Sequence, residues 1–213
     1  MLTQETHSRP GLDRRMTKTE INDCPIKKWA GPVHVIRSAE RMVEAVQLLA
    51  RQSILGFDTE TRPVFRKGQS HLPALLQLAG ENEVCIFQLK HLGLPGPLRK
   101  ILADPNIIKA GVALDYDISE LRKLAPFQEA GFVDLGELAK RVGIKNHGLR
   151  GLAAVLLGLR ITKSAQRSNW AKDTLTAGQI TYAATDAWIG RELYQKLVTV
   201  QLHSTFGRSG RLT

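Results

Sequence analysis

Two acidic side chains, Asp58 and Glu60, close the apolar segment ILGFDTE at residues 54–60. If this segment is a β-strand, alternation places both carboxylates on one face of it. Neighbouring carboxylates in an apolar setting repel each other and raise each other's pKa, and a divalent cation relieves that repulsion. Oxygen ligands suit Mg²⁺ or Mn²⁺. The alternative is a strand that has emerged into solvent with two solvated acids, so the pair alone is a weak indication of a metal site.

A third acid, Asp117, follows the apolar segment IIKAGVA at residues 107–113 and lies near the start of a predicted helix over 116–124. Acids are also favoured at this place simply because they interact with the helix dipole, and this alternative stays open on the residues alone. Asp115 lies in the same turn and is expected to cap the helix. That arrangement would leave Asp117 to project from the first turn.

Tyr182 and Asp186 are four residues apart in the last predicted helix, so they share one face of it. The residues around them are small, which would let the helix approach a sheet closely: Ala183, Ala184, Ala187 and Gly190. The alternative is an ordinary amphipathic helix with a half-buried tyrosine and an exposed aspartate. A close approach would instead carry Asp186 toward the acids at the strand end.

Taken together, four carboxylates on three separate elements and one phenol are far more specific than any single member. A carboxylate cluster that holds two metal ions about 3.5–4 Å apart is suited to in-line displacement at phosphorus. One ion activates a water molecule, and the other stabilises the leaving oxygen and the charge of the transition state. The pattern therefore predicts metal-dependent cleavage of phosphodiester bonds.

The elements that would position these residues alternate along the chain. Strands are predicted at ILGFDTE, ALLQLA and VCIF, which form an antiparallel meander, and then at IIKAGVA and FVDL. Helices are predicted from Ser38 to about 52 and over 97–103, 116–124, 135–142 and 149–157. A last helix opens with a Thr176–Gln179 capping box and runs to about 200. This order indicates an α/β domain with a mixed five-stranded sheet flanked by helices.

The composition is compatible with a nucleic-acid partner. The chain has 213 residues, is 43% hydrophobic and carries a net charge of +10, of which residues 1–31 contribute only about +2 (six Lys/Arg against four Asp/Glu). Excess positive charge on a folded domain favours a polyanionic partner, although a merely basic soluble protein is the alternative. No stretch is apolar enough for a membrane span. The two cysteines, Cys24 and Cys85, show no metal spacing, and a reduced cytoplasmic setting is expected.

The distribution of polar segments and predicted elements divides the chain into three parts. Residues 1–31 are polar and mixed in charge, and we expect a flexible N-terminal leader there. Residues 32–201 hold the predicted catalytic domain, and residues 202–213 are expected to form a flexible C-terminal tail.

Three motifs now carry a resemblance to a known family. FDTE, GVALDYD and YAATDA resemble, in order and approximate spacing, the exonuclease motifs of the DEDD superfamily. The tyrosine is typical of its DEDDy branch, which includes ribonuclease D and the Werner syndrome exonuclease domain. The segment GLRGLAAVLLGLRITKSAQRSNW is also similar, and the likeness covers residues 33–200. No histidine occurs between His147 and His203, which argues against the DEDDh branch.

The resemblance implies a ribonuclease H-like fold, two divalent ions and specific roles for the five residues. Asp58 should bridge both ions, while Glu60 and Asp186 complete the site of the ion that holds the attacking water. Asp117 should hold the second ion. Tyr182 should orient the water rather than act as a strong base, because a phenol pKa near 10 is poorly matched to neutral pH.

The resemblance also implies substrate contacts beside the site, at Lys163, Gln166, Arg167, Ser168 and Asn169. An ordinary polar loop is the alternative for each of them. The chain shows neither the additional helical domains of ribonuclease D nor the helicase of the Werner protein, so the choice between DNA and RNA cannot be carried over. The alternatives are RNA 3′-end trimming, a non-catalytic nucleic-acid-binding module on the same fold, and a ribonuclease H-fold endonuclease.

Overall fold

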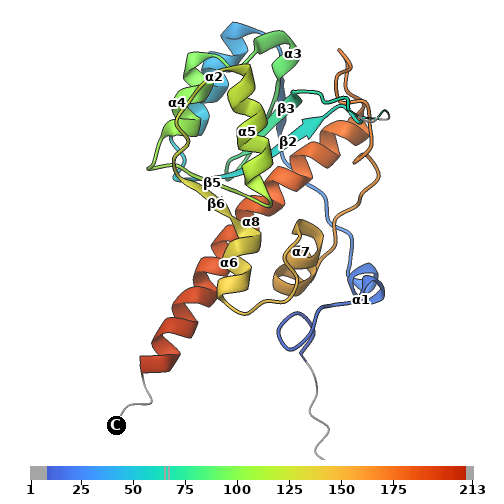
Figure 1. Ribbon diagram of the computed structural model, residues 1–213, viewed down its shortest axis with the longest axis vertical. Coiled ribbons are helices and arrows are strands. Elements are labelled where there is room, and N and C mark those ends of the chain that lie inside the picture. The colour runs from blue at the N-terminus through green and yellow to red at the C-terminus, as the bar shows by residue number, and fades with distance from the viewer. Residues whose placement is uncertain (1–8, 65, 67, 210–213) are drawn as a thin grey trace, which may run out of the picture.

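A six-stranded mixed sheet forms the centre of the computed structural model, which describes residues 9–64, 66 and 68–209 (Figure 1). The strand order is β1-β4-β3-β2-β5-β6. The strands are β1 (Val33–Ile36), β2 (Ile54–Thr61), β3 (Pro73–Ala79), β4 (Val84–Gln88), β5 (Ile108–Gly111) and β6 (Phe132–Asp134). β3 pairs antiparallel with β2 and β4, whereas β1 pairs parallel with β4, β5 with β2 and β6 with β5.

The predicted antiparallel meander and the α/β class are confirmed, but the predicted count of five strands is wrong. The missed strand, β1, is only four residues long and lies at the edge of the sheet. Four residues are too few for an alternating pattern to be recognised, and the half-exposed side chain of His34 stands between two valines. Its partner, β4, lies some fifty residues away in the chain. Pairing of this non-local kind leaves no local signal in a sequence.

Helices cover both faces of the sheet. They are α1 (Lys18–Asp23), α2 (Ala39–Leu49), α3 (Leu89–Leu92), α4 (Gly96–Ala103), α5 (Leu114–Leu124), α6 (Leu135–Arg141), α7 (Leu149–Leu157) and α8 (Ala177–Ser209). In Figure 1, α2, α4 and α5 lie on one side of the sheet and α8 crosses the other. Met42, Leu49 and Leu98 pack against Leu55 and Phe57 of β2 on the first side. α6 and α7 extend the second layer beside α8.

Helix α8 lies unusually close to the sheet because glycines stand at the contact. A Cβ atom on Gly56 of β2 would overlap the carbonyl oxygen of Ala187. A Cβ on Gly190 would lie 2.7 Å from the carbonyl oxygen of Ala110 in β5. The prediction that small residues let this helix approach the sheet is therefore confirmed, and the approach depends on one glycine from each side.

Two of the predicted helix starts, at Ser38 and at Thr176, agree with the observed N-terminal caps. Ser38 accepts a hydrogen bond from the Arg41 backbone N–H, and Thr176 and Gln179 form the expected reciprocal pair. The last helix runs to Ser209, further than the predicted end near 200, and in Figure 1 its red end extends beyond the sheet.

Part of the predicted leader has regular structure. Residues 18–23 form α1 against α7, and the Trp29 backbone N–H donates to the Thr185 hydroxyl at 3.0 Å. Residues 1–8 and 210–213 lie outside the described residues. The domain boundaries at 31 and 202 stay predictions. Within the described residues, no helix is both long and apolar enough to cross a membrane.

Candidate active site

Strand β2 presents different side chains to the two faces of the sheet, as the predicted alternation requires. Leu55 and Phe57 pack into the core under α2 and α4, while Gly56 faces α8. Asp58 and Glu60 continue the face of Gly56. A register irregularity between Glu60 and Thr61 ends the regular pairing with β3 just after the second acid. Such bulges commonly re-aim a side chain beside a functional site.

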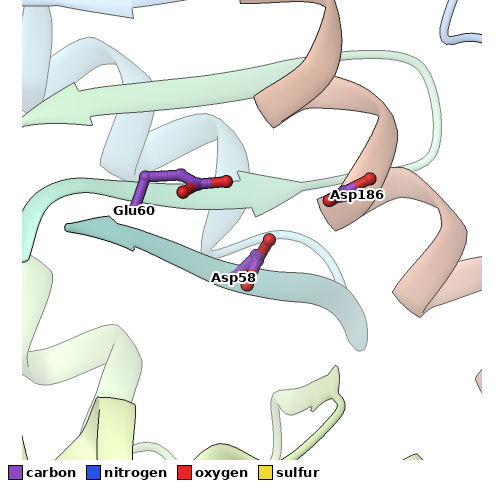
Figure 2. Close-up of side chains that lie close together, drawn as sticks. All are labelled: Asp58, Glu60 and Asp186. Carbon is purple, nitrogen blue, oxygen red and sulfur yellow. The ribbon is translucent and has the colours of Figure 1, made fainter. Parts of the chain in front are cut away.

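Asp58, Glu60 and Asp186 converge in space, although Asp186 is more than a hundred residues from the other two. One carboxylate oxygen from each lies within 4.8 Å of the others, and Figure 2 shows the three side chains pointing toward one another. Asp186 is 8% exposed and the other two are half-buried. The structure therefore brings together three of the four predicted metal ligands.

Asp117 stands beside this cluster rather than within it. It projects from the first turn of α5, and the Thr59 hydroxyl donates to its Oδ1 at 2.7 Å. Thr59 lies between the two acids of β2 and takes the opposite face, so the strand contacts α8 on one side and α5 on the other. The fourth carboxylate is thus fixed to the same strand through a hydrogen bond.

The expectation that Asp115 caps α5 is wrong. The helix begins at Leu114, and its N-cap is Ala113, whose backbone is left-handed with φ of 59°. The Leu114 N–H donates instead to Asp134 Oδ2 at 3.2 Å. Asp134 also caps α6 by accepting from the Gly136 and Glu137 backbone N–H groups, so its role is structural.

Burial and mutual repulsion raise the pKa values of the acids. Burial, together with the charges of Asp58, Asp186 and Asp117, raises the pKa of Glu60 to about 10. Burial also raises the pKa of Asp186 to about 7, against the lowering effect of its hydrogen bond with Tyr182. Asp58 has a raised pKa through burial and through the charges of Asp186 and Asp117. The site therefore holds negative charge at a cost that a cation would remove.

The donor set fits divalent cations. Asp186 Oδ1 is buried and has no hydrogen-bond partner among the described residues, and its nearest carboxylate neighbours add only further acceptors. Buried carboxylate oxygens are rarely left without a partner. An all-oxygen, multiply charged cluster is the ligand set that Mg²⁺ and Mn²⁺ prefer. Asp58, Glu60 and Asp186 would hold such ions, with Asp117 at the side.

Tyr182 lies one turn before Asp186 and is 8% exposed. Burial and the neighbouring carboxylates raise its pKa above the ordinary value for a phenol. A phenol with a raised pKa keeps its proton at neutral pH, which agrees with orienting a water molecule and not with acting as a strong base. Its ring lies 5.8 Å from that of Trp170. Trp170 is fully buried, as expected of a packing residue.

The five predicted substrate contacts divide into two groups. Lys163 and Gln166 line a hollow that reaches Tyr182 and Asp186. Arg167, Ser168 and Asn169 line none of the hollows found in the described part of the chain that include the acids. Asn169 has a local role, because its carbonyl oxygen accepts from Gln179 Nε2 at 3.2 Å. These contacts stay predictions, and the geometry favours the first two.

Sequence reasoning missed two polar residues beside the acids. Thr59 anchors Asp117 as described above. Gln77 is the cross-strand partner of Asp58 in β3, is fully buried, and has neither amide atom hydrogen-bonded to any described residue. Directly opposed residues share a face of the sheet, so its amide lies on the side of Asp58. A single polar residue inside the otherwise apolar ALLQLA was the signal that could have found it.

The raised pKa values predict that stability without metal falls as the pH rises. Glu60 and Asp186 ordinarily titrate near 4.5 and 3.8, but their pKa values in the fold are about 10 and about 7. A pKa raised on folding favours the folded state below the unfolded pKa, and this contribution is lost as the pH rises through the folded value. Thermal unfolding with EDTA should therefore show a falling melting temperature between about pH 5 and pH 9.

Mg²⁺ or Mn²⁺ should restore the melting temperature, most strongly at the alkaline end, and binding should release protons. Because other groups titrate over the same range, the quantity to compare is the difference between scans with and without the ion. A metal-induced shift that is absent, or the same at every pH, would contradict the clustered-acid explanation.

Comparison with known proteins places the chain in one family. The family model described as 3′-5′ exonuclease matches residues 33–201. Over 155 residues, 33% are identical to the mouse bifunctional 3′-5′ exonuclease/ATP-dependent helicase WRN, a match that covers 70% of this chain and 11% of that protein. A ribonuclease D from Gluconacetobacter diazotrophicus is 30% identical over 182 residues, covering 84% and 44%. The chain thus spans less than half the length of either relative.

A solved structure supports the same assignment. The Nibbler EXO domain from Aedes aegypti superimposes with a TM-score of 0.72 at 27% identity, covering 80% of this chain and 89% of that one. The likeness agrees with the mixed sheet and its helical layers, so the predicted ribonuclease H-like fold is confirmed. The converging acids, the helix that carries Tyr182 and Asp186, and the match over nearly the whole domain agree: the chain belongs to the 3′-5′ exonuclease family.

Proposed function

We propose that the protein removes nucleotides one at a time from the 3′ end of a nucleic-acid strand and releases nucleoside 5′-monophosphates. The convergence of Asp58, Glu60 and Asp186 within 4.8 Å carries this proposal. Two divalent ions held in this cluster would supply an activated water and would neutralise charge on the phosphoryl group under attack. Mg²⁺ or Mn²⁺ is proposed because every ligand atom is a carboxylate oxygen.

The chain's own residues have distinct tasks in this reaction. Asp58, Glu60 and Asp186 would hold the cations at the strand end, and Asp117, kept in place by Thr59, would act from the side. Tyr182 keeps its proton and orients the attacking water, since its hydroxyl lies beside Asp186. Positioning reacting groups in this way removes much of the entropic cost of a hydrolysis. The chain carries all four acids and the tyrosine, which counts against a non-catalytic module.

The test uses 5′-end-labelled single-stranded DNA, duplex DNA with a recessed 3′ end, and RNA of the same sequence, each with Mg²⁺ or Mn²⁺. A ladder that shortens from the 3′ end, together with 5′-monophosphate products, is expected. Relative rates decide between DNA and RNA 3′-end trimming, and between the two metals. A closed circular single strand should stay whole, and cleavage of the circle would assign an endonuclease instead.

Replacing Tyr182 with Phe should lower kcat by about 10- to 100-fold while the metal-induced rise in melting temperature persists. The reason is that the variant loses only the hydroxyl that orients the water, and misplacement of a reacting group costs up to about 10²-fold in rate. Steady-state kinetics with the preferred substrate would measure the effect. Tyr194→Phe is the matched control, because Tyr194 lies further along α8, lines neither hollow that contains the acids, and should behave as wild type. Equal kinetics for the two variants would refute the role of Tyr182.

A reduced, cytoplasmic location is part of the proposal and rests on cysteine usage. Cys24 and Cys85 are both free, and Cys85 is buried in the sheet. Fluorescence microscopy of the tagged chain in its native cell would test it.

A further inference from the structure

A second hollow adjoins the one that contains the acids. The smaller hollow, of about 250 Å³, holds Asp58 and Glu60, and the larger, of about 520 Å³, extends away from them. Leu149, Gln166, Tyr182 and Asp186 line both, so the two hollows are continuous at the catalytic helix. A strand whose 3′ end occupies the smaller hollow can therefore continue into the larger one.

The wall of the larger hollow is basic. Four cationic side chains line it: Arg15 and Lys18 from the N-terminal segment, Arg150 from α7, and Lys163 from the loop before α8. Among the described residues that line this hollow, Asp186 is the sole acid, and it belongs to the catalytic cluster. Lys163 lines the larger hollow together with Tyr182 and Asp186, which also line the smaller one. The basic side chains therefore line a hollow that adjoins the carboxylate cluster.

The N-terminal segment is fastened to the domain at this wall. The Met16 backbone N–H donates to Asn146 Oδ1 at 2.9 Å, and Arg15 Nε donates to the Lys145 carbonyl oxygen at 3.0 Å. A capping box between Thr17 and Glu20 fixes the start of α1. Figure 1 shows α1 beside α7, from which it is separated by more than a hundred residues of chain. The wall is consequently part of the fold.

Arg150 joins the two sides of the wall and retains an unused donor. Its guanidinium donates to the Asn22 side chain of α1. Its Nε is buried and has no hydrogen-bond partner among the described residues. Arg150 lines the hollow, and guanidinium groups bind phosphate oxygens through strong, charge-assisted hydrogen bonds.

We propose that this basic hollow binds the phosphates of the nucleotides upstream of the scissile bond, with Lys18 and Arg150 as direct phosphate ligands. The inference rests on the proposed exonuclease function and names a substrate site for it. Carboxylates repel the backbone of the strand that they cut, so cations beside them are needed to hold it. Contacts to phosphate fix register without reading the sequence. The N-terminal segment thereby becomes part of the substrate-binding surface.

The test compares a single-stranded 12-mer with a dinucleotide of the same sugar, because only the longer strand reaches the second hollow. Lys18→Ala should raise KM for the 12-mer about 3- to 10-fold, and Lys18→Glu should raise it more. The loss should fall in KM and not in kcat, and KM for the dinucleotide should be unaffected by either change. The slope of log affinity against log salt for the 12-mer should decrease by about 0.7, the value of one phosphate contact on a single strand.

The Lys18 side chain makes no hydrogen bond or ion pair to another described residue, so its removal is not expected to unfold α1. Lys100 is an exposed residue of α4, on the other side of the sheet. Lys100→Ala therefore removes one positive charge far from the hollow, and this control variant should bind the 12-mer as the wild type does. Lys18→Arg should retain wild-type binding.

Equal losses for both substrate lengths, or equal losses in Lys18→Ala and Lys100→Ala, would overturn the inference. Fluorescence anisotropy of a labelled 12-mer, without turnover, separates this result from a failure of the proposed function. A wild-type protein that binds the 12-mer but does not cut it overturns the exonuclease assignment. Length-dependent weakening by Lys18→Ala in that assay supports the basic hollow regardless.

Discussion

Replacing Asp58 with Asn should lower metal-dependent cleavage by about 10²- to 10³-fold and, without metal, should raise the melting temperature. The activity loss follows because Asp58 is one of the three clustered carboxylates that would hold the ions, and removal of one preorganised group at a reacting centre costs about 10²–10³ in rate. The rise in stability follows because the variant loses a buried negative charge whose pKa the fold raises. Loss of activity and gain of stability together are not expected of a residue whose role is structural.

The measurements are the end-labelled ladder assay and thermal unfolding with EDTA. The metal-induced rise in melting temperature should shrink in the same variant, since one ligand is missing. Asp115→Asn is the matched control, because Asp115 lies in the first turn of α5 but outside the cluster. An Asp58→Asn variant that trims strands at the wild-type rate would refute the proposal that the carboxylate cluster is the catalytic metal site.

Replacing Gly56 with Ala should remove most of the activity, although the added methyl group contacts no catalytic side chain. The added Cβ would overlap the Ala187 carbonyl oxygen, and backbone atoms of a long helix cannot turn away as a flexible side chain can. Helix α8 must then move off the sheet and carry Asp186 with it. Overpacking of this kind costs about 1–3 kcal/mol of stability. A displacement of about 1 Å at a reacting centre costs about 10²-fold in rate.

Circular dichroism, thermal unfolding and the ladder assay measure the two effects separately. The variant should stay folded at low temperature yet lose the metal-induced stabilisation, because the three carboxylates no longer converge. Gly96→Ala is the control: Gly96 lies in the first turn of α4, and a Cβ there meets only the far end of Arg99 at 3.9 Å. If Gly56→Ala kept full activity and its metal response, the close approach of α8 would not be what assembles the site.

The sequence alone determined which residues could do the chemistry. Asp58 and Glu60 are two positions apart on one strand, and Tyr182 and Asp186 are four positions apart on one helix, so each pair shares a face. Both spacings can be recognised in the sequence because they are local properties of a chain. Capping at Ser38 and at Thr176 was equally readable, since each cap involves residues only three positions apart. The α/β class followed from the order of these local patterns.

Only the tertiary structure decided how the pieces meet. Gly56 against Ala187 sets the distance between α8 and β2, and so decides that Asp186 joins the strand acids. The hydrogen bond from Thr59 holds Asp117 beside the cluster. The hydrogen bond from the Met16 N–H to Asn146 holds the N-terminal segment against the domain, where it lines the neighbouring hollow. β1 was missed for the same reason. Each of these contacts joins residues some fifty or more positions apart, and their energies come from burial and packing that no local period encodes.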